Sequence, residues 1–375
     1  MSEREATPPL LLMTPGPTRV PERVLRAGAR PMIHHRTDEF SAELATMLEL
    51  LAPVFGTRGP VLPVHATGRA GMEAAICNLF SAGDEIAVCC NGKFGEMWAA
   101  FAESYGVTVH RIATDWTRDV DAREVGTFLA SHRRVMAVAL AYCDTSTGVR
   151  NDVAGVARAV REGRDDALVL VDGVSSLGGM PFAFDEWGVD FAVTASQKCL
   201  MASPGLAFVA LSERAWTASV RARLPRNYWD FTGIRHHVTQ AKPETPGTAP
   251  VHLVLQVAEA LRMLHEEGLP SVQRRHEAMA ARVRHRVAEL GLVAPCPELR
   301  SLSPTLTAIA LPAGLAPKTV RDRLKARGIL TAAGLGAFRE TAFRIGHMGD
   351  IRMPDVERTL GALADALAQA PSLSR

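Results

Sequence analysis

Lysine is scarce in this 375-residue chain: only 5 of its 42 basic residues are lysine, and all the others are arginine. Arginine stays charged in proteins, whereas a lysine in a partly desolvated place can lose its proton. A chain that prefers arginine for surface charge is expected to use arginine at an indifferent position too. Lys198, where an apolar run gives way to a Gly/Pro loop, is therefore either a chemically required amine or a surface lysine that extends into water.

Long hydrophobic runs are also missing. The longest ones, such as 137–141 and 167–171, are far shorter than the roughly 20 residues of a membrane span. The first 17 residues carry mixed charge and one short apolar stretch, so we expect no secretory signal. We therefore expect no membrane association.

The six cysteines have no CxxC or Cys/His ligand spacing, so neither a disulfide framework nor a zinc site is expected. A reducing cytoplasm is the expected location. The formal charge of +2 comes from interspersed acids and bases, which leaves no basic stripe for nucleic acid. The expected partner is a small molecule.

Short apolar runs alternate with amphipathic helical patterns over about 200 residues, a rhythm that predicts an α/β fold with a mostly parallel sheet covered on both faces. Seven runs are the expected strands: 60–64, 85–90, 108–113, 135–142, 167–172, 190–195 and 206–211.

The rhythm changes after about residue 250. Residues 251–290 read as two long helices with Gly268 and Pro270 at the break, and the rest alternates strands and helices in the manner of a compact α+β domain. We predict an N-terminal arm over 1–20, a large domain over 21–267 and a smaller C-terminal domain over 268–375.

Polar residues follow several of the predicted strands, where open parallel sheets bind their ligands. The loop "ATGRAG" (66–71) opens a helix whose N-terminus could hold a phosphate, although small loops before helices are common. Phe94 is either a platform for a flat ring or a core residue. Asp172, at the end of "ALVLVD", is either a functional carboxylate or an ordinary cap, and "CDTSTG" (143–148) is either a ligand loop or a turn.

Together these residues fit one chemistry. An amine that forms a Schiff base must be able to lose its proton. Pyridoxal 5'-phosphate requires such a lysine, a carboxylate facing its pyridine nitrogen, a phosphate cradle and a flat partner for the ring. Lys198, Asp172, the 66–71 loop and Phe94 supply all four.

The chain also resembles a known family, the class V, fold-type I aminotransferases, in particular the alanine:glyoxylate and serine:pyruvate branch. The matching motifs follow the order of that family and span nearly the whole chain. They are "TPGPT" (14–18), "ATGRAGMEAA" (66–75), "NGKFGE" (91–96), "DTSTGV" (144–149), "VDGVSSLGG" (171–179), "SQK" (196–198), "ETPGTAPV" (244–251) and "FRIGHMG" (343–349).

The resemblance implies roles for individual residues. Lys198 would bind the cofactor aldehyde and then move the substrate proton, and Asp172 would pair with the pyridinium. Phe94 would lie against the ring, and Thr145 would hydrogen-bond near its substituents. The phosphate would be held by Gly68, Arg69, Ser196 and Gln197, together with Thr245 and Thr248 of a neighbouring subunit. Arg344 and the amide of Gly16 would hold the substrate carboxylate. The family consists of homodimers with shared active sites, so a homodimer is expected.

The chain departs from the family pattern at two of these positions. The family often has Trp or Tyr where Phe94 stands, and a small residue or His where Arg69 stands. Arg69 either adds a phosphate contact or points towards the substrate. Arg344 has a structural alternative, which is an ion pair with Asp350 or Glu340.

The resemblance implies a ping-pong aminotransferase that moves an amino group from alanine or serine to glyoxylate or another small 2-oxo acid. The alternatives are an (S)-ureidoglycine:glyoxylate or 2-aminoethylphosphonate transaminase, a pyridoxal-phosphate-dependent lyase such as a cysteine desulfurase, and a non-enzymatic regulator. A desulfurase needs a cysteine on a mobile loop near the substrate, whereas Cys199 is expected behind the cofactor. The adjacent histidines at 34–35 and 236–237 cannot all face one ion, so no metal is expected.

Overall fold

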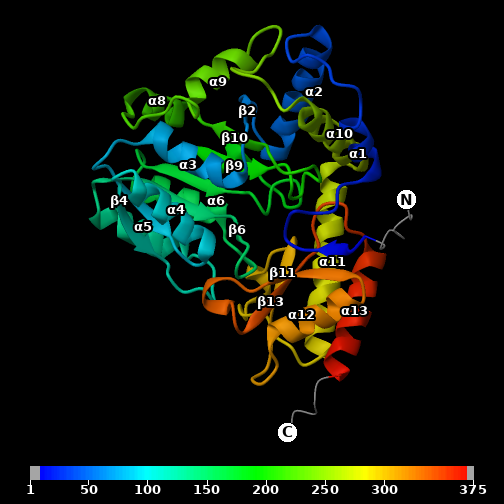
Figure 1. The fold of residues 1–375 in the computed structure, drawn as a ribbon. Coiled ribbons are helices and arrows are strands. Elements are labelled where there is room, and N and C mark those ends of the chain that lie inside the picture. Colours follow the sequence, from blue (N-terminus) through cyan, green and yellow to red (C-terminus); the bar gives the residue numbers. More distant parts are fainter. Residues whose placement is uncertain (1–8, 370–375) are drawn as a thin grey trace.

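The computed structural model describes residues 9–369 and contains a large sheet with helices on both faces (Figure 1). The sheet has seven strands in the order β2-β10-β9-β8-β5-β3-β4, and β10 runs opposite to the other six. The seven predicted runs are thereby confirmed. Their bounds are β2 Val61–Val64, β3 Glu85–Cys89, β4 Thr108–Ile112, β5 Val135–Ala141, β8 Leu168–Asp172, β9 Phe191–Ala195 and β10 Ala207–Leu211.

The strands are apolar on both faces because each face carries its own layer of helices. Alternate residues of β5 enter different cores: Val138 joins one and Ala139 the other. One core includes α2 (Asp38–Phe55), α5 (Ala122–Ser131), α6 (Val153–Gly163) and α10 (Val251–Glu267). The other includes α3 (Gly68–Leu79), α4 (Lys93–Ser104), α8 (Glu213–Arg221) and α9 (Phe231–Val238).

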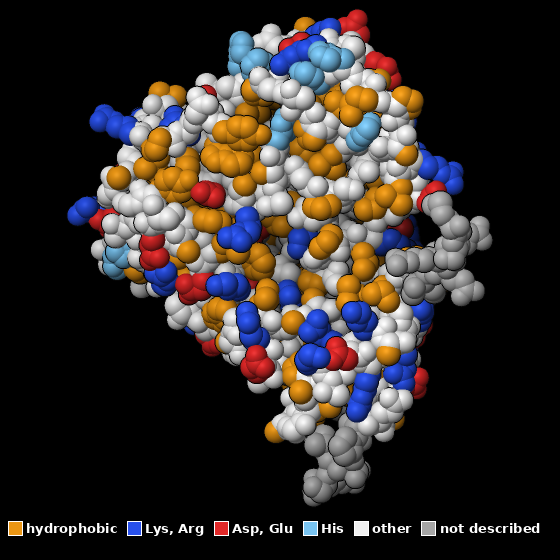
Figure 2. All heavy atoms as spheres, viewed as in Figure 1, with side chains coloured by type: hydrophobic (Ala, Val, Ile, Leu, Met, Phe, Trp, Pro, Cys, Tyr) orange, Lys and Arg blue, Asp and Glu red, His pale blue; other side chains and the backbone are white. Residues whose placement is uncertain are grey.

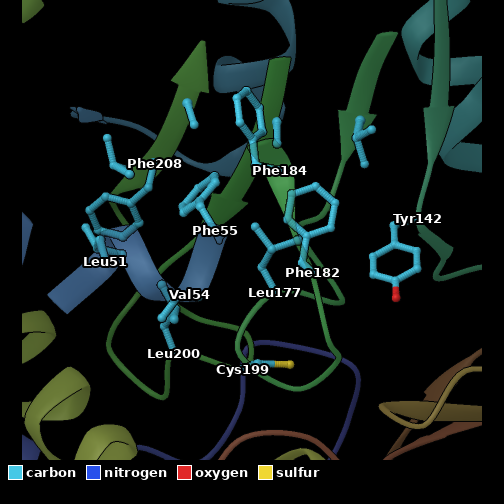
Figure 3. Close-up of a cluster of buried hydrophobic side chains, with 14 of the residues drawn as sticks. Leu51, Val54, Phe55, Tyr142, Leu177, Phe182, Phe184, Cys199, Leu200 and Phe208 are labelled. Atoms are coloured by element: carbon cyan, nitrogen blue, oxygen red, sulfur yellow. The ribbon is translucent and has the colours of Figure 1, made fainter. Parts of the chain in front are cut away.

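Aromatic side chains fill much of the first core. Figure 3 shows Phe55, Phe182, Phe184 and Phe208 close together, with Cys199 at the edge of the same apolar cluster. The helices α1 (Glu22–Gly28) and α7 (Phe184–Trp187) complete this part of the chain. Such close packing fixes the ends of the strands, from which the loops of the candidate site extend.

A second sheet lies below the first in Figure 1 and has the order β1-β12-β13-β11. Its first strand comes from the N-terminal segment, runs parallel to β12 and pairs Leu11 with Ile329. The elements are β1 Leu11–Met13, β11 Leu306–Ala310, β12 Ile329–Ala333, β13 Ala342–Gly346, α11 Leu269–Glu289, α12 Pro317–Ala326 and α13 Met353–Ala368. Shorter pieces are β6 Cys143–Asp144, β7 Val149–Arg150, η1 Leu299–Ser301 and η2 Gly336–Phe338.

Helix α11 joins the two parts of the molecule. It starts after Gly268, whose positive φ of 82° ends α10, while Pro270 lies in its first turn. Val272 packs in the large core, whereas Met279 and Val283 pack in the small one. Since α11 contributes to both cores, the proposed division at residue 267 remains a prediction.

The surface differs between the two parts. In Figure 2, hydrophobic side chains are spread over the upper part of this face, and Lys and Arg gather over the lower part. Among the helices of residues 9–369, none has the length and apolar character that a bilayer crossing requires.

Candidate active site

Lys198 and Asp172 lie at the same edge of the large sheet. Asp172 is the last residue of β8, and Lys198 follows the end of β9 by three residues. These strands are parallel neighbours, with Asp172 in register with Val193. Parallel strands end at one edge, so the two predicted reactive groups share the carboxyl edge.

The amine of Lys198 is held by the N-terminal segment. Its Nζ donates a hydrogen bond to the carbonyl oxygen of Pro15. Gly16 follows with a φ of +97°, and a Cβ at this position would lie 2.8 Å from Nζ. Burial lowers the pKa of Lys198 to about 8, Asp172 opposes this shift, and Arg344 adds to it. The neutral amine is therefore accessible near physiological pH.

Asp172 is a buried carboxylate, 3% exposed. Its Oδ1 accepts a hydrogen bond from the N–H of Val174 at 2.8 Å. Burial raises the pKa of Asp172 to about 7, the Val174 N–H lowers it, Asp144 raises it further, and Lys198 lowers it. A carboxylate in this setting is stabilised as the anion by a cationic partner.

The N-terminus of α3 offers main-chain donors. Thr67 precedes the helix, and its side chain makes no cap. Within residues 9–369 we find no acceptor for the N–H groups of Gly68 and Arg69. A Cβ on Gly68 would lie 2.6 Å from Val174, so this close approach requires glycine. These free amides and the helix dipole suit an anion.

The side chain of Arg69 points elsewhere. It is exposed, and its guanidinium carbon lies 5.7 Å from the ring centre of Phe101 on α4. Phe101 is two turns beyond Phe94, away from the start of that helix. The main chain of Arg69 therefore belongs to the candidate anion site, whereas its guanidinium rests on α4.

Phe94 and Thr145 come from two segments that meet. Phe94 is half-buried in the first turn of α4. Thr145 is buried, and its hydroxyl lies 2.6 Å from that of Ser175. Ser175 was not among the predicted residues, although it lies in the quoted "VDGVSSLGG" motif.

Arg344 lies in β13 of the small sheet and is only 7% exposed. Its Nε donates to the carbonyl of Ala333 at 2.8 Å, and its Nη1 donates to that of Thr145 at 2.9 Å. Burial lowers its pKa to about 10, and Asp144 opposes this shift. In the described part of the chain Arg344 has no ion pair, whereas Asp350 pairs with Arg19. The alternative pairing of Arg344 with Asp350 or Glu340 is thus not found.

The remaining residues predicted to bind phosphate differ in whether their polar side-chain atoms already have hydrogen-bond partners. Ser196 is buried, and its hydroxyl donates to the carbonyl of Ser203 at 2.6 Å. Gln197 has a buried side-chain oxygen for which the described residues offer no partner. Thr245 is buried and donates to the carbonyl of Gly247 at 2.6 Å, while Thr248 is exposed.

The sequence did not point to Asp144, a fully buried carboxylate that links the start of α4 to the 143–148 turn. Its Oδ2 accepts from the N–H of Phe94 at 2.8 Å and of Gly95 at 3.4 Å. Its Oδ1 accepts from the N–H of Ser146 at 2.8 Å and from its hydroxyl at 2.5 Å. Burial raises the pKa of Asp144, and these donors oppose that shift. The available signal was its place in the loop "CDTSTG", directly before Thr145.

A cavity of about 660 Å³ lies apart from these residues, between the N-termini of α5 and α6 and residues 298–301. Its arginines are already paired: Arg118 with Glu124, and Arg300 with Glu298. We therefore place the candidate site at Lys198 and Asp172, where burial shifts the pKa values of both groups, and not in this cavity.

Cysteine chemistry gains no support from the geometry. The six cysteines are buried and free. Cys199 packs at the apolar cluster of Figure 3, and burial raises its pKa to about 12. A buried thiol with a raised pKa is a poor nucleophile.

The mostly parallel seven-stranded sheet, the smaller α+β part and the amine–carboxylate pair at the carboxyl edge define a fold-type I pyridoxal-phosphate transferase. The family model described as "Aminotransferase class-V" matches residues 11–352. The chain therefore belongs to the class-V aminotransferases and is a pyridoxal-phosphate-dependent transaminase, which confirms the resemblance seen in its motifs.

Individual relatives cover nearly all of the chain. The L-aspartate–glyoxylate aminotransferase of Paracoccus denitrificans is 38% identical over 347 residues, 91% of this chain and 86% of the relative. The small subunit of the soluble hydrogenase of Synechococcus sp. is 38% identical over 362 residues, 96% and 93% of the two chains. The alanine–glyoxylate aminotransferase structure from Nostoc sp. aligns with a TM-score of 0.91 at 33% identity, covering 98% and 97%.

Proposed function

We propose that this transaminase moves the amino group of a small amino acid, alanine or serine, to glyoxylate or another small 2-oxo acid by a ping-pong mechanism. The observation that carries the proposal is the position of Lys198 and Asp172 at one edge of the sheet, after the parallel neighbouring strands β9 and β8. Two of the similar proteins are named as glyoxylate aminotransferases, which supports glyoxylate as the acceptor.

The residues fit pyridoxal 5'-phosphate. The N–H groups of Gly68 and Arg69 and the side-chain oxygen of Gln197 have no partner within residues 9–369, and Phe94 offers a ring face at the start of α4. Asp172 supplies the carboxylate for a protonated ring nitrogen. When bound, this cofactor draws electrons from the substrate Cα, which makes its proton removable. The hydroxyl of Ser196 holds the loop around Lys198 through its hydrogen bond to Ser203, and a contact of Ser196 with the phosphate remains a prediction.

The chain's own groups would carry out the proton transfer and the orientation. Lys198, neutral above about pH 8, accepts the proton from the substrate Cα and later returns one. Arg344 keeps its charge and is fixed by two carbonyl oxygens, so that Nη2, which has no acceptor within residues 9–369, can face the substrate carboxylate. The N–H of Gly16, beside Lys198, would meet the same carboxylate.

The proposal includes a homodimer in the cytoplasm. Thr248 is exposed on the 246–248 loop, and the nearby Tyr228 is 66% exposed. We infer that both meet a second copy of the chain, and their exposure supports this. Thr245, whose hydroxyl is bound to Gly247, would shape the loop that presents Thr248 to the partner's phosphate.

A half-reaction screen tests the function. Single amino acids are added to the purified holoenzyme, and the visible absorption of the bound cofactor is followed. Alanine or serine should bleach it, and glyoxylate should restore it. Lys198→Ala should abolish both changes, while Lys318→Ala, which removes an exposed lysine paired with Asp322, should keep them. Turnover by Lys198→Ala, or sulfide release from cysteine without a 2-oxo acid, would overturn the proposal.

A further inference from the structure

Helix α4 is capped from a distant segment. α5, α6, α8 and α9 each receive a side-chain cap from the residue directly before them. α4 begins after Gly92, which has no side chain to offer. Its first N–H groups are bound by a turn about 50 residues later: Ser146 Oγ accepts from Lys93 at 3.0 Å, and Asp144 accepts from Phe94 and Gly95.

The glycine before the helix makes this contact possible. A Cβ on Gly92 would overlap the carboxylate of Asp144. Its φ of 174° is an extended conformation, so the requirement is for space and not for backbone freedom. The start of α4 therefore has little room to shift relative to the 143–148 turn.

The same turn reaches Arg344. Thr145, next to Asp144, accepts a hydrogen bond from Arg344 through its main-chain oxygen and lies 2.6 Å from Ser175 through its hydroxyl. The charge of Asp144 also adds to the raised pKa of Asp172 and opposes the lowering of the pKa of Arg344 by burial. Asp144 thus lies between the segments that carry Phe94, Thr145 and Arg344.

A buried carboxylate is costly unless strong donors surround it. Main-chain N–H groups at a helix start are such donors, because the helix dipole adds to the hydrogen bonds. We propose that Asp144 is a positioning residue, which fixes the start of α4 and the 143–148 turn so that Phe94, Thr145 and Arg344 meet the cofactor and substrate together. This inference rests on the proposed function.

The test compares two buried carboxylates at opposite edges of the sheet. Asp144→Asn puts an N–H group where α4 needs an acceptor. Asp190→Asn is the control at the amino edge, because Asp190 is 1% exposed, precedes β9, and accepts from Val169 N–H at 2.9 Å and Ser212 at 2.7 Å, although it also pairs with Arg161. Both variants are expected to lose thermal stability. Ser146→Ala, which keeps the carboxylate, is a milder variant at the same turn.

In the holoenzyme, Asp144→Asn should lower kcat/KM for the amino donor roughly 10- to 100-fold, since a hydrogen bond to a charged group is lost. KM should rise more than kcat falls, and the visible circular dichroism of the cofactor should weaken because the ring loses its fixed platform. Ser146→Ala should show the same pattern at smaller amplitude. Asp190→Asn should keep the wild-type KM and dichroism.

The outcomes separate the two proposals. If the wild-type protein takes up no cofactor, the function itself is wrong. If the wild type is active but Asp144→Asn and Asp190→Asn differ from it only in melting temperature, Asp144 has a structural role alone and the inference is overturned.

Discussion

The guanidinium of Arg344 donates to the carbonyl oxygen of Thr145 at 2.9 Å, and this bond joins the small sheet to the carboxyl edge of the large one. The residue that we propose for the substrate carboxylate is thereby fixed before substrate arrives, which would reduce the entropy lost on binding.

Arg344→Lys should therefore weaken substrate binding although the charge is retained. A lysine ammonium cannot reproduce the planar fork that contacts Ala333 and Thr145 and still faces a carboxylate. We expect KM for the amino donor to rise roughly 10- to 100-fold. Steady-state kinetics measure this effect, and Arg321→Lys, on α12, serves as the control. An unchanged KM would remove Arg344 from the substrate site.

Covalent capture of pyridoxal 5'-phosphate by the cofactor-free protein should depend on pH. Only the neutral amine reacts, and burial lowers the pKa of Lys198 to about 8. The capture rate should rise with pH and reach its midpoint near 8, as followed by stopped-flow absorption. A midpoint close to 10.5, the ordinary value for lysine, would show that Lys198 is not desolvated in solution.

Asp172→Asn should stabilise the cofactor-free protein while reducing its activity. The folded-state pKa of about 7 lies above the ordinary 3.8, so the stability contributed by protonated Asp172 is complete below 3.8 and is lost as pH rises to about 7. The difference between the pKa of about 7 and the ordinary 3.8 corresponds to roughly 4 kcal/mol of folding free energy at most. Thermal melts should show the variant more stable than the wild type above pH 7 and similar at low pH. Equal melting temperatures above pH 7 would contradict this reading.

Gly16→Ala should impair the site through contact with Lys198. The added methyl group would lie within 3 Å of Nζ, and a φ of +97° already disfavours alanine. Gly83→Ala is a matched control, because Gly83 has a φ of +87° but nothing within 4 Å of its Cβ position. Both variants should lose roughly 1–3 kcal/mol of stability. Only Gly16→Ala should also bind the cofactor more weakly, measured by absorption titration.

Much of the fold could be predicted because its signals are local. Buried parallel strands are continuous apolar runs, and all seven were found within a residue or two of their observed bounds. β1 and β12 were missed. The three residues of β1 acquire their structure by pairing with residues more than 300 positions away, which no local pattern reveals.

The positions of Lys198 and Asp172 could be predicted from the sequence, whereas the contacts around them could not. Strand ends located Lys198 and Asp172 at one edge, as the structure shows. The direction of Arg69 depends on where α4 lies, and its contact with Phe101 could not be read from a loop motif. Asp144 was missed because its partners are main-chain N–H groups. Every residue except proline carries such a group, so the sequence does not show which ones a carboxylate will bind.

The pairing of β1 with β12 also sets an order of assembly. Pro15 and Gly16, which enclose the amine of Lys198, directly follow a strand whose partner spans residues 329–333. During synthesis the first residues leave the ribosome long before that partner exists. Lys198 gains these neighbours only after residues 329–333 have been synthesised, so a chain that stops before them would leave this amine open to water and without its fixed neighbours.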